Sequence, residues 1–195
     1  RTSSEALVSF DSFQEYVHTA AAIEGLIPGE LSPFELLRRQ LDLAHPDGCC
    51  RCGFGPGLPM PLGTYRRMST SCGFVHADTS TALSPERGEF SANIYIRTPA
   101  GKGALNVYPA MQYTPDAQPQ LSELSRAQQL AYAPAAQACI RAALPLKRTV
   151  HVGDGDLVLI NTGRFHEVEA YDEGYRLSGQ CWVSFTRGEP LYLWV

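Results

Sequence analysis

The chain has 195 residues, of which 44% are hydrophobic and 18% are charged, and its formal net charge is −4. These values are typical of a globular protein with a sizeable core, and we expect a single domain spanning residues 1–195. The negative charge and the lack of a Lys/Arg run argue against a nucleic-acid or acidic-membrane partner. No apolar stretch reaches the roughly 18 residues that a membrane span needs.

The first 45 residues are predicted to be a helical flank. Residues 4–23 carry apolar side chains at spacings of three and four. A second helix is predicted to begin at Ser32-Pro33-Phe34-Glu35, because serine caps helices, proline fits the first helical position and glutamate three residues after the cap completes a capping box. Its predicted buried face is Leu36, Leu37 and Leu41, and its predicted end is His45-Pro46-Asp47-Gly48.

Residues 46–63 are rich in Gly, Pro and Cys and show no periodicity, so they are predicted to form a long loop. Cys49, Cys50 and Cys52 lie in this stretch. Structural zinc sites usually have two separated Cys or His pairs, and no second pair is visible. All six cysteines, with Cys72, Cys139 and Cys181, are therefore interpreted as reduced thiols of a cytoplasmic protein. A metal or redox role for the 49–52 cluster is the less favoured alternative.

From about Thr64 the pattern changes to short segments rich in Val, Ile, Tyr and Phe, which predicts strands. The predicted strands span 65–71, 73–76, 91–97, 104–109, 149–152, 156–161, 166–171 and 175–186. Residues 99–103 are predicted to form a hairpin connection. A helical segment over 121–144, interrupted by Pro134, is predicted to pack outside a sheet. About eight strands with flanking helices indicate a mainly β (α+β) fold such as a jelly roll.

His76, Asp78 and His166 are the candidate metal ligands. His76 and Asp78 lie two residues apart, so in an extended segment both side chains leave the same face. His166 follows a predicted buried strand and a turn, which would return its imidazole to the open end of the barrel. Two imidazoles and one carboxylate form the facial triad that binds Fe(II) and leaves coordination positions open.

Arg176 and Ser178 share one face of the last predicted strand. A guanidinium binds a carboxylate through two parallel hydrogen bonds, and a serine hydroxyl adds another. The pair therefore predicts a site for the far carboxylate of a dicarboxylate cosubstrate whose 2-oxo acid end chelates the iron.

The region from residue 76 to 185 resembles the 2-oxoglutarate/Fe(II)-dependent oxygenases, especially the prolyl-hydroxylase-like group. The resemblance is carried by His76-Ala77-Asp78, by the segments 91–96 and 103–108, by 155–160 followed by His166, and by Arg176-Leu177-Ser178. It implies a double-stranded β-helix in which His76, Asp78 and His166 bind Fe(II) and Arg176 with Ser178 binds 2-oxoglutarate. It also implies O₂ as the oxidant and further cosubstrate contacts from Asn93 and Tyr95.

The resemblance implies a dioxygenase that hydroxylates an unactivated C–H bond of a small metabolite, such as an amino acid derivative or a natural-product intermediate. Asp78 occupies the position that related halogenases leave to chloride, so halogenation is disfavoured. Desaturation or cyclisation by the same chemistry stays open, as does a non-catalytic jelly-roll module that binds a ligand. Glu167 and Glu169 beside His166 are interpreted as a solvated strand face, with the orientation of a ligand as the less favoured alternative. Trp182 is interpreted as a core aromatic, with a pocket role as the alternative.

Overall fold

The computed structural model describes residues 32–55, 58–71, 73–78, 87–112, 134–144, 146–161 and 163–195. The predicted helix over 4–23 and most of the predicted 121–144 helix lie outside these residues. The described helices are α2 (Pro33–Ala44) and α4 (Pro134–Ala143). The described strands are β1 (Cys49–Arg51), β2 (Gly53–Gly55), β3 (Leu58–Pro59), β4 (Thr64–Met68), β5 (Arg87–Arg97), β6 (Leu105–Gln112), β7 (Arg148–Val150), β8 (Leu157–Asn161), β9 (Arg164–Val168), β10 (Arg176–Thr186) and β11 (Leu191–Trp194).

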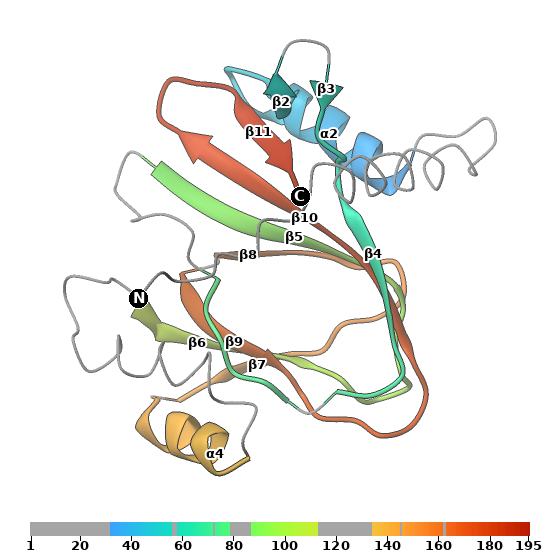
Figure 1. The fold of residues 1–195 in the computed structure, drawn as a ribbon, viewed down its shortest axis with the longest axis vertical. Helices are drawn as coiled ribbons and strands as arrows, with labels where there is room; N and C mark the ends of the chain where they lie inside the picture. The colour runs from blue at the N-terminus through green and yellow to red at the C-terminus, as the bar shows by residue number, and fades with distance from the viewer. Residues whose placement is uncertain are drawn as a thin grey trace, which may run out of the picture.

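Two facing β-sheets form the body of the molecule (Figure 1). The larger sheet has the order β1-β11-β10-β5-β8, and β4 also pairs with β10. The smaller sheet has the order β7-β6-β9, and His76 extends it through an isolated antiparallel bridge to His166 of β9. From β4 onward the chain passes repeatedly between the two sheets. This is the jelly-roll arrangement, so the predicted mainly β fold is confirmed.

Two predictions about the strands were wrong, one about a hairpin and one about the extent of a strand. The connection at 99–103 joins β5 to β6, but β5 pairs with β10 and β8 whereas β6 pairs with β7 and β9. It therefore crosses between sheets and forms no hairpin. The predicted strand at 73–76 contributes only the bridge at His76. Turn residues mark where a chain reverses, but they do not determine whether the flanking strands pair.

Helix α2 begins as predicted. The Ser32 side chain accepts a hydrogen bond from the Glu35 backbone N–H at 3.2 Å, and Pro33 is the first helical residue. The buried face was predicted in part. Leu37 is buried and Leu41 is partly buried, but Leu36 is 49% exposed and Phe34 is fully buried. Phe34, Leu37 and Leu41 share one stripe of a 3.6-residue helix, and Leu36 lies off that stripe.

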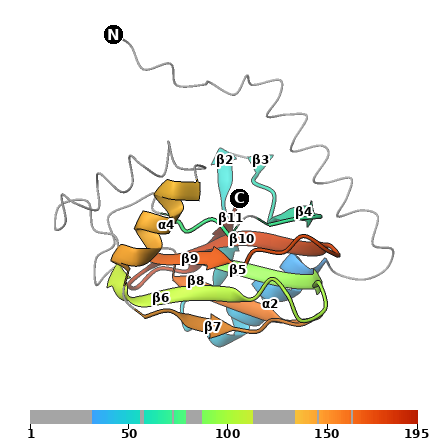
Figure 2. The ribbon, with the colours of Figure 1, turned by 90° about the horizontal axis from the view of Figure 1, so that it is seen from below.

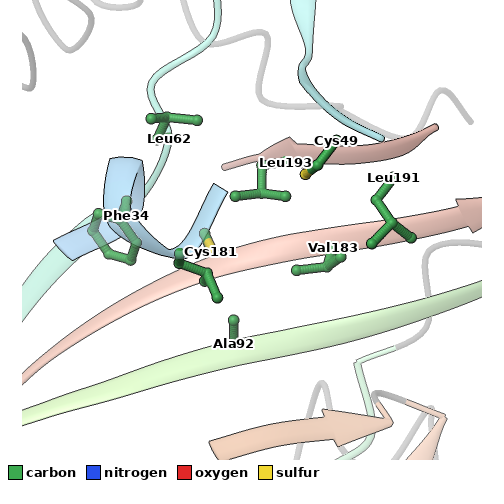
Figure 3. Close-up of a cluster of buried hydrophobic side chains, with 9 residues drawn as sticks. Phe34, Cys49, Leu62, Ala92, Cys181, Val183, Leu191 and Leu193 are labelled. Carbon is green, nitrogen blue, oxygen red and sulfur yellow. The ribbon is translucent and has the colours of Figure 1, made fainter. Parts of the chain in front are cut away.

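The hydrophobic core fills the space between α2 and the outer face of the larger sheet (Figure 3). The Phe34 ring lies against two glycines, since a Cβ placed on Gly63 or Gly179 would come within 2.3 Å or 2.6 Å of it. Side chains from β5, β10 and β11 complete the cluster. They are Ala92, Cys181, Val183, Leu191 and Leu193, with Cys49 and Leu62 from the preceding segment.

Residues 46–63 were predicted to be a loop, and this was wrong for much of the segment. Strand β1 pairs in parallel with β11, and β2 pairs with β3. Strand β11 itself was not predicted. Burial raises the pKa of the Cys49 thiol to about 11 and that of Cys181 to about 12. Both are free thiols, as are Cys50 and Cys52.

Helix α4 covers the other side of the molecule, below the smaller sheet in Figure 1 and beside β9 in Figure 2. It begins at Pro134, a residue that fits the first position of a helix. Its packing outside a sheet agrees with the prediction for this segment. Neither described helix is long and apolar enough to cross a membrane.

Candidate functional site

A cavity of about 170 Å³ lies between the two sheets. Alternation along the strands builds its walls, because every second residue of β5 and β10 faces inward while Ala92, Cys181 and Val183 face the core on the other side. The lining residues are Arg66, His76, Asp78, Ser91, Asn93, Tyr95, Leu105, Ile160, His166, Val168, Arg176, Ser178, Gln180 and Trp182. All seven predicted metal-binding and cosubstrate-binding residues are among them.

The three candidate metal ligands lie together at one side of this cavity. One ligand atom from each of His76, Asp78 and His166 lies within 4.8 Å of the others. The Asp78 carboxylate contacts His76 Nε2 at 3.6 Å and His166 Nε2 at 3.5 Å. This group of two imidazoles and a carboxylate is compact enough to share one cation.

Backbone geometry orients both imidazoles. The backbone N–H groups of His76 and His166 donate to each other's carbonyl oxygens at 2.9 Å and 2.8 Å, which places the side chains next to one another. His76 Nδ1 lies 3.1 Å from the Phe74 carbonyl, and His166 Nδ1 lies 2.9 Å from the Arg164 carbonyl. A proton on each Nδ1 satisfies these contacts and leaves both Nε2 lone pairs directed at Asp78.

The electrostatics of the group favour cation binding. Burial, followed by the nearby His166, lowers the pKa of His76, so that this imidazole is neutral at neutral pH. Burial would raise the pKa of Asp78, but its interactions with His166 and His76 hold it below its ordinary value, so this carboxylate is ionised at neutral pH. Neutral imidazoles and an ionised carboxylate are the protonation states that a metal requires.

Arg176 faces the same cavity from the larger sheet, with only 9% of its surface exposed. Its Nη2 donates to Met68 Sδ at 3.3 Å, and its guanidinium lies 5.9 Å from the centre of the Tyr95 ring. Its Nε has no hydrogen-bond partner, and none of the ion pairs among the described residues includes it. A buried guanidinium without an acidic partner is costly unless an anionic ligand neutralises it.

Ser178, Asn93 and Tyr95 line the cavity wall on the same sheet as this arginine. Ser178 is the cross-strand partner of Tyr95, and Asn93 is the partner of Gln180. Asn93 Nδ2 and Gln180 Nε2 both donate to Ser91 Oγ, at 3.0 Å and 2.9 Å. These bonds fix the amide side chains in the wall, so the cavity has a polar surface beside Arg176.

The interpretation of Glu167 as a solvated residue was wrong. Glu167 is 4% exposed and lies on the outer face of β9, where Arg141 of α4 donates to its Oε2 at 2.8 Å and 3.0 Å. Tyr108 Oη donates to the other carboxylate oxygen at 3.1 Å. The pairing was not visible in the sequence because it depends on how α4 packs.

Seven lining residues were not predicted as site residues, among them Gln180, Trp182 and Arg66. Gln180 and Trp182 continue the same period of two as Arg176 and Ser178, so the strand pattern contained the signal for both. Trp182 lines the cavity and stacks on Trp194 at 5.7 Å, which favours the pocket alternative over a purely core position. Arg66 is followed by a second arginine on β4, and the sequence does not show which of the two faces inward.

No protein-family model and no curated protein matches the chain. Its fold is similar to that of a solved structure of a novel N-substituted L-amino acid dioxygenase from Burkholderia ambifaria AMMD, with a TM-score of 0.66 and 15% identity over 100% of this chain and 74% of that chain. A structure of such a dioxygenase from the same organism in complex with alpha-KG gives a TM-score of 0.64, with the same identity and coverage. These similarities show a shared jelly-roll fold.

Proposed function

We propose that this protein is an enzyme, a non-haem Fe(II)- and 2-oxoglutarate-dependent oxygenase that hydroxylates an unactivated C–H bond of a small metabolite. The proposal rests on one cavity that is lined both by the His76–Asp78–His166 group and by Arg176, which is buried without an acidic partner. The similar fold of dioxygenases, one of them in complex with alpha-KG, supports it.

The residues present fit both groups. His76, Asp78 and His166 would hold Fe(II), because mixed imidazole and carboxylate ligation suits this ion. Arg176 and Ser178 would bind the distal carboxylate of 2-oxoglutarate, with Asn93 and Tyr95 lining the same surface. Iron bound here would couple O₂ reduction to the conversion of 2-oxoglutarate into succinate and CO₂ and to oxidation of the substrate.

The chain's own contribution is orientation and exclusion of water. The Phe74 and Arg164 carbonyls hold the two imidazoles in the tautomer that ligates through Nε2. Leu105, Ile160 and Val168 form an apolar part of the cavity wall. A substrate bound against this surface would be shielded from water on that side.

The substrate class proposed is an amino acid derivative or a natural-product intermediate. The name of the structural neighbour, an N-substituted L-amino acid dioxygenase, supports the first of these. Asp78 is present as a third ligand, which favours oxygen chemistry over halogenation, and desaturation or cyclisation would use the same centre. We also propose that the chain forms a single oxygenase domain. The cytoplasmic location stays a prediction.

Succinate formation tests the proposal. Wild-type protein supplied with O₂ and a panel of N-acyl and N-alkyl amino acids should form succinate only when Fe(II) and 2-oxoglutarate are both added. The H166A variant should form none, because it lacks a metal ligand. H151A removes an exposed histidine and should match the wild type.

Undiminished succinate formation by H166A would remove the triad from the mechanism. A wild-type protein that binds Fe(II) and 2-oxoglutarate, but forms no succinate with any member of the panel, would favour the non-catalytic ligand-binding module instead.

A further inference from the structure

A second arginine, Arg66, lines the cavity without an acidic partner. It belongs to β4 and is the cross-strand partner of Ser178 on β10. The side chain is exposed, unlike that of Arg176, and none of the ion pairs among the described residues includes it. Its neighbour Arg67 points the other way, with its guanidinium 4.8 Å from the centre of the Tyr175 ring.

The charges in the cavity favour one more anion. The described lining contains two arginines, Arg66 and Arg176, and a single carboxylate, Asp78. A divalent metal adds two positive charges, and a 2-oxoglutarate dianion with Asp78 neutralises three of the resulting four. Because charges interact strongly in a partly desolvated pocket, the remaining positive charge favours a ligand with its own carboxylate.

The two arginines differ in their exposure to solvent. Arg176 is buried and contacts Met68 and the Tyr95 ring, a position suited to a cosubstrate that binds out of solvent. Arg66 is open to solvent, a position suited to a ligand that enters afterwards. Arg66 lines the same cavity as the metal ligands His76 and Asp78.

We propose that Arg66 binds a carboxylate group of the substrate, and hence that the substrate is a small carboxylic acid that presents its free carboxylate at the cavity mouth. This inference rests on the proposed function, because it assigns Arg176 to the cosubstrate. Arginine suits the role, since its planar guanidinium matches a carboxylate with two parallel hydrogen bonds.

Tryptophan fluorescence can test this inference without turnover. The chain has two tryptophans, Trp182 and Trp194, which stack on each other, and Trp182 lines the cavity. Protein loaded with Zn(II) and N-oxalylglycine, a non-reacting 2-oxoglutarate analogue, is titrated with monocarboxylates from acetate to octanoate and with N-acetyl-L-leucine. The matched carboxamides are titrated in parallel.

The wild type should bind at least one carboxylate saturably and should bind its carboxamide more weakly. R66Q should bind that carboxylate about 10- to 100-fold more weakly, the effect of losing a charge-assisted pair, while its affinity for N-oxalylglycine stays unchanged. R67Q removes the same charge one residue away, on the other face of β4, and should match the wild type.

Three results would overturn the role of Arg66: no carboxylate bound by the wild type, equal binding of carboxylates and carboxamides, or a loss of N-oxalylglycine affinity in R66Q. Failure of the proposed function gives a different result, in which the wild type does not bind N-oxalylglycine or R176Q binds it as tightly as the wild type.

A separate set of contacts concerns the metal ligands. Helix α4 holds the segments that carry both histidines. The Gln137 side chain accepts from the Val75 backbone N–H at 2.8 Å and donates to the Val75 carbonyl at 3.3 Å. Arg141 donates to Glu167, the neighbour of His166, and also to the Gly73 carbonyl.

These side chains replace a missing strand pairing. Residues 73–75 form no ladder with β9, and His76 alone makes the bridge to it. The Gln137 amide therefore satisfies the backbone of the residue before His76, while the pair between half-buried Arg141 and buried Glu167 joins that segment to β9. We infer that Gln137 and Arg141 are positioning residues that set the separation of the two metal-binding imidazoles.

Metal affinity is the readout that distinguishes positioning from general stability. Q137L and R141M should bind Zn(II) about 10- to 100-fold more weakly than wild type by calorimetry, at a temperature where all proteins are folded. K102M breaks the exposed pair between Lys102 and Glu173 and should retain wild-type affinity. Variants that melt at lower temperature but bind Zn(II) like the wild type would show that α4 has only a structural role.

Discussion

At the scale of single residues, the cavity is defined by charged groups that the protein itself leaves unneutralised. Arg176 is buried, its Nε has no hydrogen-bond partner, and its Nη2 donates to the sulfur of Met68. A sulfur is a weak acceptor compared with a carboxylate. The unsatisfied guanidinium therefore lowers the free energy of unfolding of the ligand-free protein, and a bound anion offsets this loss.

Replacement of Arg176 by Gln should raise the 2-oxoglutarate concentration for half-maximal succinate formation by about 10- to 100-fold, because a charge-assisted pair is lost, with a smaller effect on the maximal rate. R97Q removes an exposed β5 arginine that pairs with Asp154 and should leave this concentration unchanged. An unchanged 2-oxoglutarate requirement in R176Q would exclude Arg176 from cosubstrate binding.

R176Q should also affect the stability of the ligand-free protein. Chemical denaturation of metal-free R176Q should give a free energy of unfolding equal to that of the wild type or up to about 2 kcal/mol higher, because an unsatisfied buried charge is removed. A loss of more than about 1 kcal/mol would mean that Arg176 stabilises the fold rather than a ligand.

At the scale of elements, the docking of α2 depends on close contact between an aromatic ring and glycine backbone. Phe34 fills the space above Gly63 and Gly179, and no side chain larger than hydrogen fits at either glycine without movement of the ring. Gly179 lies on β10, next to Ser178, so this contact supports the strand that carries Arg176 from behind.

A double-mutant cycle tests this contact. F34A should reduce the free energy of unfolding by about 3–5 kcal/mol through the cavity it leaves, and G179A by about 1–3 kcal/mol through overpacking. The double variant should lose less than the sum, since the new methyl group enters the space left by the ring. G88A, where a Cβ meets only an ordinary contact at 3.8 Å, is the control. Additive losses would contradict the proposed packing.

At the scale of the whole molecule, the candidate site joins the two sheets. The triad lies on the side of the smaller sheet, whereas Arg176 and Ser178 belong to the larger one. A metal alone therefore contacts one side of the cavity, but a cosubstrate that reaches from the metal to Arg176 connects both. Ligand binding to the folded state alone raises its stability by mass action.

Zn(II) should accordingly raise the melting temperature, and N-oxalylglycine should raise it further only when metal is present. At ligand concentrations about 100-fold above Kd, each increment should be about 5–10 °C for a chain of this length. A chelator should reverse both shifts, and R176Q should keep the first and reduce the second to half or less. Stabilisation by N-oxalylglycine without metal would contradict a shared site.

The sequence predicted those features that depend on local pattern. The period of two placed Arg176 and Ser178 on one face, and capping chemistry predicted the start of α2 at Ser32. The pairing of β1 with β11 was missed because both strands are short and their partners lie at distant positions in the chain. The roles of Glu167 and Arg66 were missed because they depend on the packing of α4 and on which of two adjacent arginines on β4 faces inward.

The central position of β10 has a consequence for how the protein reaches its native state. This strand pairs with β4, β5 and β11, and two of these precede it by long stretches of sequence. Non-local pairings of this kind slow folding, because loop closure must precede the contacts that compensate for it. Until β10 is in place, β4 and one edge of β5 are exposed to pairing with other chains, so slow refolding and early aggregation are expected at high protein concentration.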